Sequence, residues 1–239
     1  MEKPILFEVK DGVAIITLNR PHRRNAINQA LLTYLYEYID EVTNCDSINV
    51  AILTGNGKSF CSGIDLDVVL MENLVDPRGD GRDFTEIIGS CKKPIIGAIN
   101  GHAITGGLEI ALNCDFLIAS EYASFADTHI SMGVHPGWGM MQLLRQAIGP
   151  RMTKQMSLSG EHVSAEKALT WGLVNEVVPH DELMPRAKQI ASSIRGANQD
   201  ILLMLKNLIE YGDRSTMEEA MAHERRSFKE FAITHLMRE

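Results

Sequence analysis

The chain has 239 residues, which fits one large domain or a domain with an appended subdomain. Hydrophobic residues make up 45% and charged residues 23%, as is typical of a globular protein with a sizeable core. The formal net charge is −8 and the densest basic cluster is only residues 20–24, which argues against a nucleic-acid-binding protein. That cluster is either a solvated loop or an anchor for an anionic ligand. No apolar run is long enough to span a bilayer.

The first half of the chain alternates strand and helix patterns. Two strands are predicted around a turn at Asp11-Gly12, and the second ends at Pro21. A helix is predicted after Asn28 as N-cap, from apolar residues at helical spacing: Leu31, Leu32, Leu35, Ile39 and Val42. Short apolar strands are predicted at residues 49–55, 93–101 and 114–120. This order predicts an α/β core with a mostly parallel sheet.

Later segments differ in character. Residues 73–84 are polar and rich in Gly, Pro and Asp, which predicts a mobile surface loop. Met140, Met141 and Leu144 have the spacing of a helix that packs into the core. Ser164 is predicted to cap a helix, followed by a strand at residues 173–178. The remainder is expected to be amphipathic helix suited to packing on another surface.

Several common site motifs are missing. The four cysteines are far apart, which predicts neither a zinc site nor a redox motif; we expect reduced thiols in a cytosolic protein, since no secretory leader is recognised. The stretch at residues 55–59 resembles a phosphate-binding loop, but Ile52 stands where that motif needs glycine. Neither a dinucleotide fingerprint nor a Gly-x-Ser-x-Gly elbow occurs.

Two glycine-marked turns follow predicted strands, at residues 59–66 and 101–109. Ligands of open α/β sheets sit at the carboxyl ends of strands, and N–H groups at a helix start are unpaired. Two such turns side by side would direct two N–H groups at one oxygen, forming an oxyanion hole. Glu109 follows the second turn within an apolar run, where an unpaired carboxylate is costly. We therefore predict that Glu109 faces the same pocket as an acid/base group.

With these residues in view, the sequence resembles the crotonase superfamily, the enoyl-CoA hydratase/isomerase group. The matching stretches are residues 12–28, 50–66, 93–120, 125–139 and 164–179. The resemblance covers residues 7–179, with a looser helical match beyond. It implies an α/β fold of the ClpP/crotonase type, a crotonase-like spiral of ββα turns with a C-terminal helical region used in trimer contacts. We expect residues 1–179 to form the acyl-CoA-binding core and residues 180–239 to serve oligomerisation and active-site cover.

The resemblance also implies acyl-CoA thioester substrates and an enolate intermediate. Its motif matches place the oxyanion-hole N–H groups at Ile64 and Gly106. No metal and no redox cofactor is expected, since coenzyme A is part of the substrate. Arg24 and Lys58 are candidates for contacts with the phosphates of CoA. The positions expected to bind the substrate or CoA are Arg24, Ala26, Ser62, Gly63, Asp65, Leu66 and Gly107.

The main departure from the family lies at the second catalytic glutamate. The first glutamate of the family's hydratases matches Glu109, but the second falls at His129. Histidine, with an ordinary pKa of about 6.5, can act as acid or base. Asp127 would share a face with His129 in an extended segment and could orient it. Enoyl-CoA hydratase is the first choice; the alternatives are a decarboxylase, an isomerase, or a non-catalytic acyl-CoA-binding relative.

Further expectations concern the surroundings of this site. His102 is expected to be structural, and Trp138 to pack rather than stack on a ligand. Family members usually carry one more helix with an aromatic residue over the acyl-CoA, so the cover is expected to be shorter here or lent by a neighbouring subunit. We expect a cytoplasmic homotrimer or dimer of trimers in fatty acid metabolism, without nucleic-acid or membrane partners.

Overall fold

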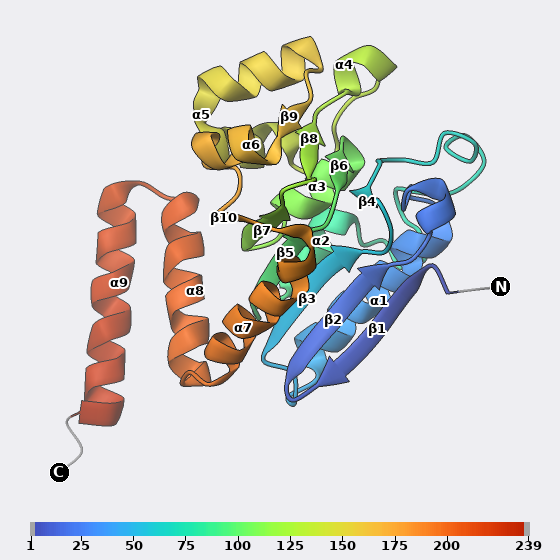
Figure 1. Ribbon diagram of the computed structural model, residues 1–239. Helices are drawn as coiled ribbons and strands as arrows, with labels where there is room; N and C mark the ends of the chain where they lie inside the picture. The colour runs from blue at the N-terminus through green and yellow to red at the C-terminus, as the bar shows by residue number, and fades with distance from the viewer. Residues whose placement is uncertain (1–2, 237–239) are drawn as a thin grey trace. The chain divides into compact units, whose positions relative to one another are not determined.

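The computed structural model describes residues 3–236, and the chain divides into two compact units, Met1–Arg195 and Gly196–Glu239 (Figure 1). The expected domain ranges also include residues 1–2 and 237–239, which lie outside the described residues. The two units are described separately below.

The first unit contains ten strands and most of the helices in the described part of the chain. The strands are β1 (Ile5–Lys10), β2 (Val13–Leu18), β3 (Val50–Gly55), β4 (Ser59–Cys61), β5 (Ile95–Ile99), β6 (His102–Ile104), β7 (Phe116–Ser120), β8 (Ser124–Ala126), β9 (Val163–Ser164) and β10 (Glu176–Val178). The helices are η1 (Pro21–Arg23), α1 (Gln29–Asn44), α2 (Phe84–Ser90), α3 (Gly106–Leu112), α4 (His129–Met132), α5 (Met140–Ser159), α6 (Ala165–Trp171), η2 (His180–Glu182) and α7 (Leu183–Arg195).

These strands form two sheets. The larger has the order β1-β2-β3-β5-β7-β10 and is parallel except for the β1–β2 hairpin. The smaller has the order β4-β6-β8-β9, with β8 and β9 antiparallel. Successive ββα turns place β3, β5 and β7 in the larger sheet and β4, β6 and β8 in the smaller one. The chain therefore winds as a crotonase-like spiral, as the resemblance predicts.

Local sequence signals account for several of these elements. Asp11 and Gly12 both have positive φ, 49° and 76°, the conformation that a tight type I′ hairpin turn needs. Asn28 caps α1 as predicted, since its side chain accepts the N–H of Leu31 at 3.0 Å. Ser164 caps α6 in the same way.

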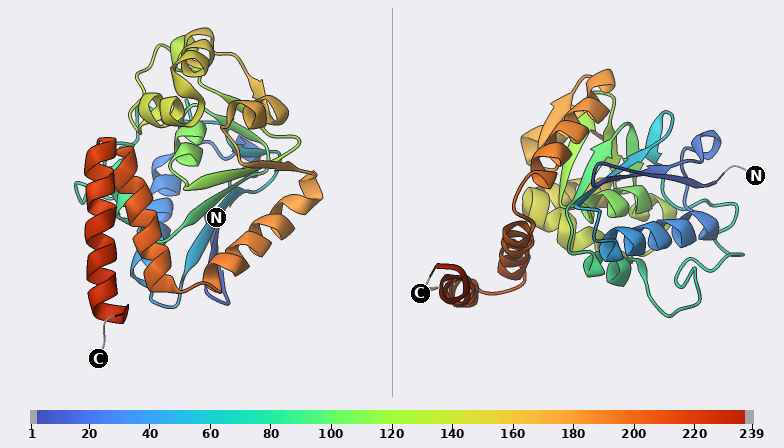
Figure 2. Two further views of the ribbon diagram at one scale, coloured as in Figure 1. Left: turned by 90° about the vertical axis from the view of Figure 1, so that its left-hand side faces the viewer. Right: turned by 90° about the horizontal axis from the view of Figure 1, so that it is seen from below.

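Helices cover both faces of the larger sheet. Ala51 and Leu53 of β3 belong to the cluster that packs with α1, whereas Ile52 belongs to the cluster that packs with α7 (Figures 1 and 2). Consecutive residues of a strand point to opposite faces, so a strand covered on both faces is apolar throughout. Leu183 of α7 is buried in this contact. The helix is therefore part of the first compact unit, which extends to Arg195. The functional division into residues 1–179 and 180–239 stays a prediction.

Residues 73–84 are irregular but fastened to α1. Arg78 and Arg82 both form ion pairs with Asp40 of α1. The side chain of Asp76 accepts two backbone N–H groups of the same segment. Asp83 caps α2 with a complete capping box. These contacts anchor the segment at several points, and its mobility stays a prediction.

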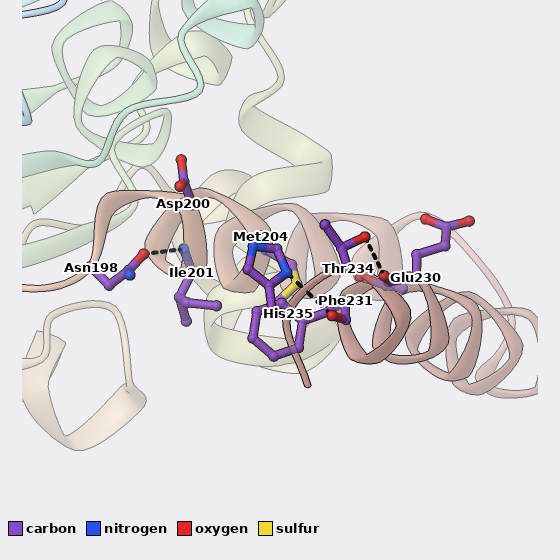
Figure 3. Close-up of a pocket in the computed structure, with 9 residues that line it drawn as sticks. Asn198, Asp200, Ile201, Met204, Glu230, Phe231, Thr234 and His235 are labelled. Atoms are coloured by element: carbon purple, nitrogen blue, oxygen red, sulfur yellow. Dashed lines mark hydrogen bonds between the residues drawn. The ribbon is translucent and has the colours of Figure 1, made fainter. Parts of the chain in front are cut away.

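The second unit is a pair of helices with little core of its own. It consists of α8 (Gln199–Asp213), α9 (Met217–Phe231) and η3 (Ala232–Leu236). Within its described residues, neither α8 nor α9 has a buried side chain. Ile201, Met204 and Phe231 line a cavity between these elements (Figure 3). Large apolar side chains such as Ile209 and Phe228 are exposed, so this unit leaves apolar surface uncovered.

Candidate active site

A cavity of about 360 Å³ lies where the two glycine turns meet α4. Its walls bring together residues that are far apart in the sequence: Glu109, His129, and the oxyanion candidates Ile64 and Gly106. Of the other predicted positions, Ser62, Gly63 and Leu66 also line it. The described residues that line the cavity do not include the remaining predicted positions, Arg24, Ala26, Asp65 and Gly107.

The two glycine turns are in contact, as the sequence predicts. Gly63 has φ 93°, and a Cβ atom there would lie 3.0 Å from the carbonyl oxygen of Ile104 and 3.6 Å from the nitrogen of Gly106. Only glycine combines this conformation with so close an approach. The turn at Gly63 therefore lies against the N-terminus of α3.

Each turn presents one N–H group without a protein acceptor. Ile27 pairs with both neighbours of Ile64: its N–H donates to Gly63 and its carbonyl accepts from Asp65, each at 2.8 Å. The N–H of Ile64 is left out of this bridge. Gly106 is the first residue of α3, where an N–H has no acceptor within the helix. Within residues 3–236, neither N–H donates to another protein group.

Gly107 has a packing role. A Cβ atom at this position would lie 2.1 Å from the carbonyl oxygen of Cys61 in β4, which is far inside van der Waals contact. Glycine here lets α3 lie directly on the smaller sheet. Gly107 therefore contributes to the site indirectly, by letting the two glycine turns approach each other closely.

Glu109 lies in the first turn of α3, and its carboxyl group is buried against the cavity. Burial raises its pKa above the ordinary value, against the opposing influence of the Trp138 N–H and of the His129 charge. The N–H of Trp138 donates to Oε1 at 2.8 Å, while Oε2 is 3.9 Å from Nε2 of His129. One carboxyl oxygen is thus anchored, and the other faces the imidazole.

His129 is buried at the start of α4 and is held by Asp127. Its Nδ1 lies 2.6 Å from Oδ1 of Asp127, and its backbone N–H donates to the same oxygen at 3.2 Å. Burial raises the pKa of Asp127, but its hydrogen bonds with the ring and the backbone N–H of His129 help to outweigh burial, so that pKa lies below the usual range. An ionised Asp127 accepts a hydrogen bond from Nδ1–H, which leaves Nε2 to face Glu109.

The expected pairing of Asp127 and His129 is therefore present, but by a different geometry. The segment is not extended, since β8 ends at Ala126 and α4 begins at His129. Asp127 reaches the imidazole across a turn that its own carboxylate closes.

Asp65 has a structural partner. Its carboxylate is buried and receives a hydrogen bond from Arg20 at 2.9 Å, while Arg20 also donates to the carbonyl of Ala26. These bonds fix the turn that carries Ile64. Arg24 is exposed. Its backbone carbonyl accepts the N–H of Ser62 at 3.1 Å, which places it next to the first glycine turn. Binding of substrate or CoA by these positions stays a prediction.

Two further expectations concerned His102 and Trp138. His102 is exposed, bonds Ser124 at 2.7 Å and is outside the cavity lining, which supports its structural role. Trp138 packs against Phe84 with ring centroids 5.1 Å apart, as expected of a packing residue. It also lines the cavity and anchors Glu109 through its backbone, which the sequence did not predict.

Sequence reasoning missed several cavity residues. Thr105 and Thr128 both line the wall beside predicted catalytic positions. The apolar part of the wall is formed by Leu66, Val69, Leu74, Val75, Met132, Val134 and Trp138. These side chains come from four separate segments, so no local sequence pattern marks them as parts of one wall.

The helices within residues 3–236 lack the length and apolar character needed to cross a membrane. No group of three His, Cys, Asp or Glu side chains in this range is arranged to hold a metal ion.

Comparison with known proteins places this geometry in a family. The profile of the enoyl-CoA hydratase/isomerase family matches residues 8–239. A probable peroxisomal enoyl-CoA hydratase 1 of Arabidopsis thaliana is 38% identical over 91% of this chain and 86% of its own. A short-chain-enoyl-CoA hydratase of Clostridium acetobutylicum is 35% identical over 95% and 88%. The crystal structure of an enoyl-CoA hydratase from Bacillus anthracis aligns with a TM-score of 0.87 at 30% identity, over 95% and 90%. The chain belongs to the enoyl-CoA hydratase/isomerase family, within the crotonase superfamily.

Proposed function

We propose that this crotonase-type, acyl-CoA-processing enzyme adds water across the C2=C3 double bond of a 2-enoyl-CoA. One observation carries the proposal. Oε2 of Glu109 and Nε2 of His129 are 3.9 Å apart in a cavity that also presents the N–H groups of Ile64 and Gly106. An oxyanion hole beside two proton-transfer groups is the equipment that hydration through an enolate needs.

The reaction balances with these groups alone. Water loses a proton to one member of the pair as its oxygen attacks C3. The double-bond electrons then move toward the thioester oxygen, which accepts hydrogen bonds from Ile64 and Gly106. The other member of the pair protonates C2 of the enolate. Glu109 and His129 therefore hold one proton between them before and after the reaction, and no metal or redox cofactor is required.

The surroundings of His129 support a proton-transfer role. A histidine that only fills space needs no buried carboxylate on Nδ1, whereas Asp127 fixes the ring so that Nε2 faces Glu109. The two relatives described above are named enoyl-CoA hydratases, which agrees with this assignment.

The cavity wall supports an uncharged acyl group. Its apolar side chains include Leu74 and Val75 from residues 73–84, together with Met132 and Val134 after His129. We assign the CoA end to the neighbourhood of Arg24, which is exposed beside Ser62.

The assembly and location are also proposals. We propose a homotrimer or a dimer of trimers, in which the helices after residue 180 supply subunit contacts and active-site cover. The uncovered apolar surface of α8 and α9 supports this role. A cytoplasmic location remains a prediction, since relatives include proteins named peroxisomal and mitochondrial.

The deciding experiment compares two thioesters. We expect wild-type protein to hydrate crotonyl-CoA and to leave malonyl-CoA intact. Hydration is measured as the loss of absorbance of the conjugated thioester. His129→Ala should lower hydration by about 10²- to 10⁴-fold, and His129→Glu should recover part of it. His102→Ala, at an exposed histidine outside the cavity, is the matched control.

Each alternative has its own outcome. Loss of CO₂ from malonyl-CoA with no crotonyl-CoA hydration would replace hydratase by decarboxylase. Hydration that is insensitive to His129→Ala would remove His129 from the mechanism. Tight acyl-CoA binding without turnover of either thioester would indicate a non-catalytic relative.

A further inference from the structure

Thr105 has an unusual backbone conformation at the centre of the site. It joins β6 to α3 and immediately precedes Gly106, with φ 52° and ψ −112°. A β-branched residue rarely adopts positive φ, because its Cβ atom crowds the backbone. Strained residues of this kind persist only where their surroundings hold them, and they cluster at functional sites.

Three hydrogen bonds join Thr105 to the segment before His129. Its N–H donates to the carbonyl of Ala126 at 2.8 Å. Its hydroxyl oxygen accepts the backbone N–H of Thr128 at 3.0 Å and shares a second hydrogen bond with the Thr128 hydroxyl, 2.5 Å away. Thr128 is the residue directly before His129. We call these two residues the Thr105–Thr128 pair.

Thr105 is also linked to the other reacting groups. Its carbonyl accepts the N–H of Glu109 at 2.9 Å, which starts the hydrogen-bond ladder of α3. A Cβ atom on Gly63 would lie 3.6 Å from the Cβ of Thr105, so the turn that carries Ile64 packs against it as well. One residue thus contacts the two turns of the oxyanion hole, the helix of Glu109 and the segment of His129.

We propose that Thr105 is a positioning residue and that the Thr105–Thr128 pair fixes the position of His129 relative to the oxyanion hole. The reason lies in the substrate. Its thioester oxygen and its C2 and C3 atoms belong to one rigid conjugated unit, so Gly106 and His129 must be placed together to within about 0.5 Å. Residues 106 and 129 are in different turns of the spiral, and the pair is a direct bond between those turns. This inference rests on the proposed function, because it takes His129 as a reacting group.

The first test is a double-mutant cycle on crotonyl-CoA. Thr105→Val and Thr128→Val each remove one hydroxyl, and each should lower kcat by about 10- to 100-fold with little change in KM. The double variant should be no worse than the poorer single variant, because the pair is already broken. Thr105→Ser, which keeps the hydroxyl, should retain most of the wild-type kcat.

The controls separate positioning from stability. Thr170→Val removes an exposed hydroxyl in α6 and should leave kcat unchanged. Thr128 has an ordinary φ of −101°, so Thr128→Val does not depend on a strained backbone. Reductions in kcat that multiply in the double variant, or that appear in KM alone, would overturn the proposal.

A second readout does not depend on turnover. In this structure Nε2 of His129 lies 3.9 Å from Oε2 of Glu109. We expect crystal structures of Thr105→Val and Thr128→Val to show this ring displaced by about 0.5 Å or more, and the structure of Thr170→Val to show it in place. An unmoved ring in both cavity variants would refute the positioning role. Failure of wild-type protein to hydrate crotonyl-CoA would instead refute the proposed function, and the ring positions would still decide on the pair.

Discussion

Oδ1 of Asp127 lies 2.6 Å from Nδ1 of His129 and also accepts the backbone N–H of the same residue. The side chain and the main chain of His129 are thus fixed by a single buried oxygen. This arrangement sets both the tautomer of the ring and its direction, and it leaves Nε2 opposite Glu109.

Asp127→Asn should therefore lower kcat by about 10²-fold, because a neutral amide holds the ring less firmly than a carboxylate does. Steady-state kinetics on crotonyl-CoA measure the effect. Asp46→Asn, at an exposed aspartate, is the control. A wild-type kcat in Asp127→Asn would show that the orientation of His129 does not limit the reaction.

Glu109→Gln should keep the fold and the affinity for CoA but lower turnover by about 10²- to 10⁴-fold. The amide oxygen can still accept the Trp138 N–H, so the side chain stays in place without proton-transfer ability. Kinetics and calorimetric CoA binding measure the two quantities separately. Glu41→Gln, on the exposed side of α1, is the control, and a near-normal rate in Glu109→Gln would remove Glu109 from the mechanism.

The raised pKa of Glu109 predicts a pH-dependent stability cost. A carboxyl group whose pKa is higher in the folded than in the unfolded state binds its proton more tightly when the protein is folded. Its favourable contribution to the free energy of unfolding is therefore fully present at low pH, where the group is protonated. That contribution is lost as pH rises through the raised pKa. Glu109→Gln should thus have a higher free energy of unfolding than wild type near pH 8, and the difference should shrink as pH falls toward the ordinary value of 4.5. Urea unfolding at several pH values tests this; a difference that grows toward low pH would contradict it.

Gly107→Ala should lower the free energy of unfolding by about 1–3 kcal/mol or more, because the added methyl group collides with the carbonyl of Cys61. Activity should fall as well, since α3 and the N–H of Gly106 are pushed away from the other turn. Gly89→Ala is the matched control: it is exposed in α2, and a Cβ atom there meets nothing within 4 Å. Equal stability of the two variants by urea unfolding would show that the contact with β4 is not constraining.

We expect light scattering at micromolar concentration to give three or six times the mass of one chain. Helices α8 and α9 bury no side chain within the described residues, so their apolar faces need a partner surface. Ile209→Asp, which places a charge on this exposed surface, should shift the mass downward, whereas Asn207→Asp on the same helix should not. A monomeric mass for wild type would contradict the proposed assembly.

Short-range chemistry made much of this protein predictable from its sequence. Asp11 and Gly12 specify a hairpin, Asn28 and Ser164 cap helices, and the residues concerned are neighbours in the chain. The two glycine turns and Glu109 were predictable because glycine and a buried carboxylate both lower the stability of a fold. Their presence in an apolar segment therefore indicates a functional role. His129 was predictable from the family motifs, because it occupies the position of the second catalytic glutamate.

Contacts between distant segments were decided only by the tertiary structure. Trp138 supplies the N–H that anchors Glu109, Arg20 binds Asp65, and Thr105 bonds Thr128, although the members of each pair are 23 or more positions apart in the sequence. No local propensity encodes such pairings, since they arise when successive turns of the spiral stack and bring their loops to one edge. The docking of α7 on the larger sheet follows the same logic: its amphipathic pattern predicted an apolar face, but only packing determined which surface covers it.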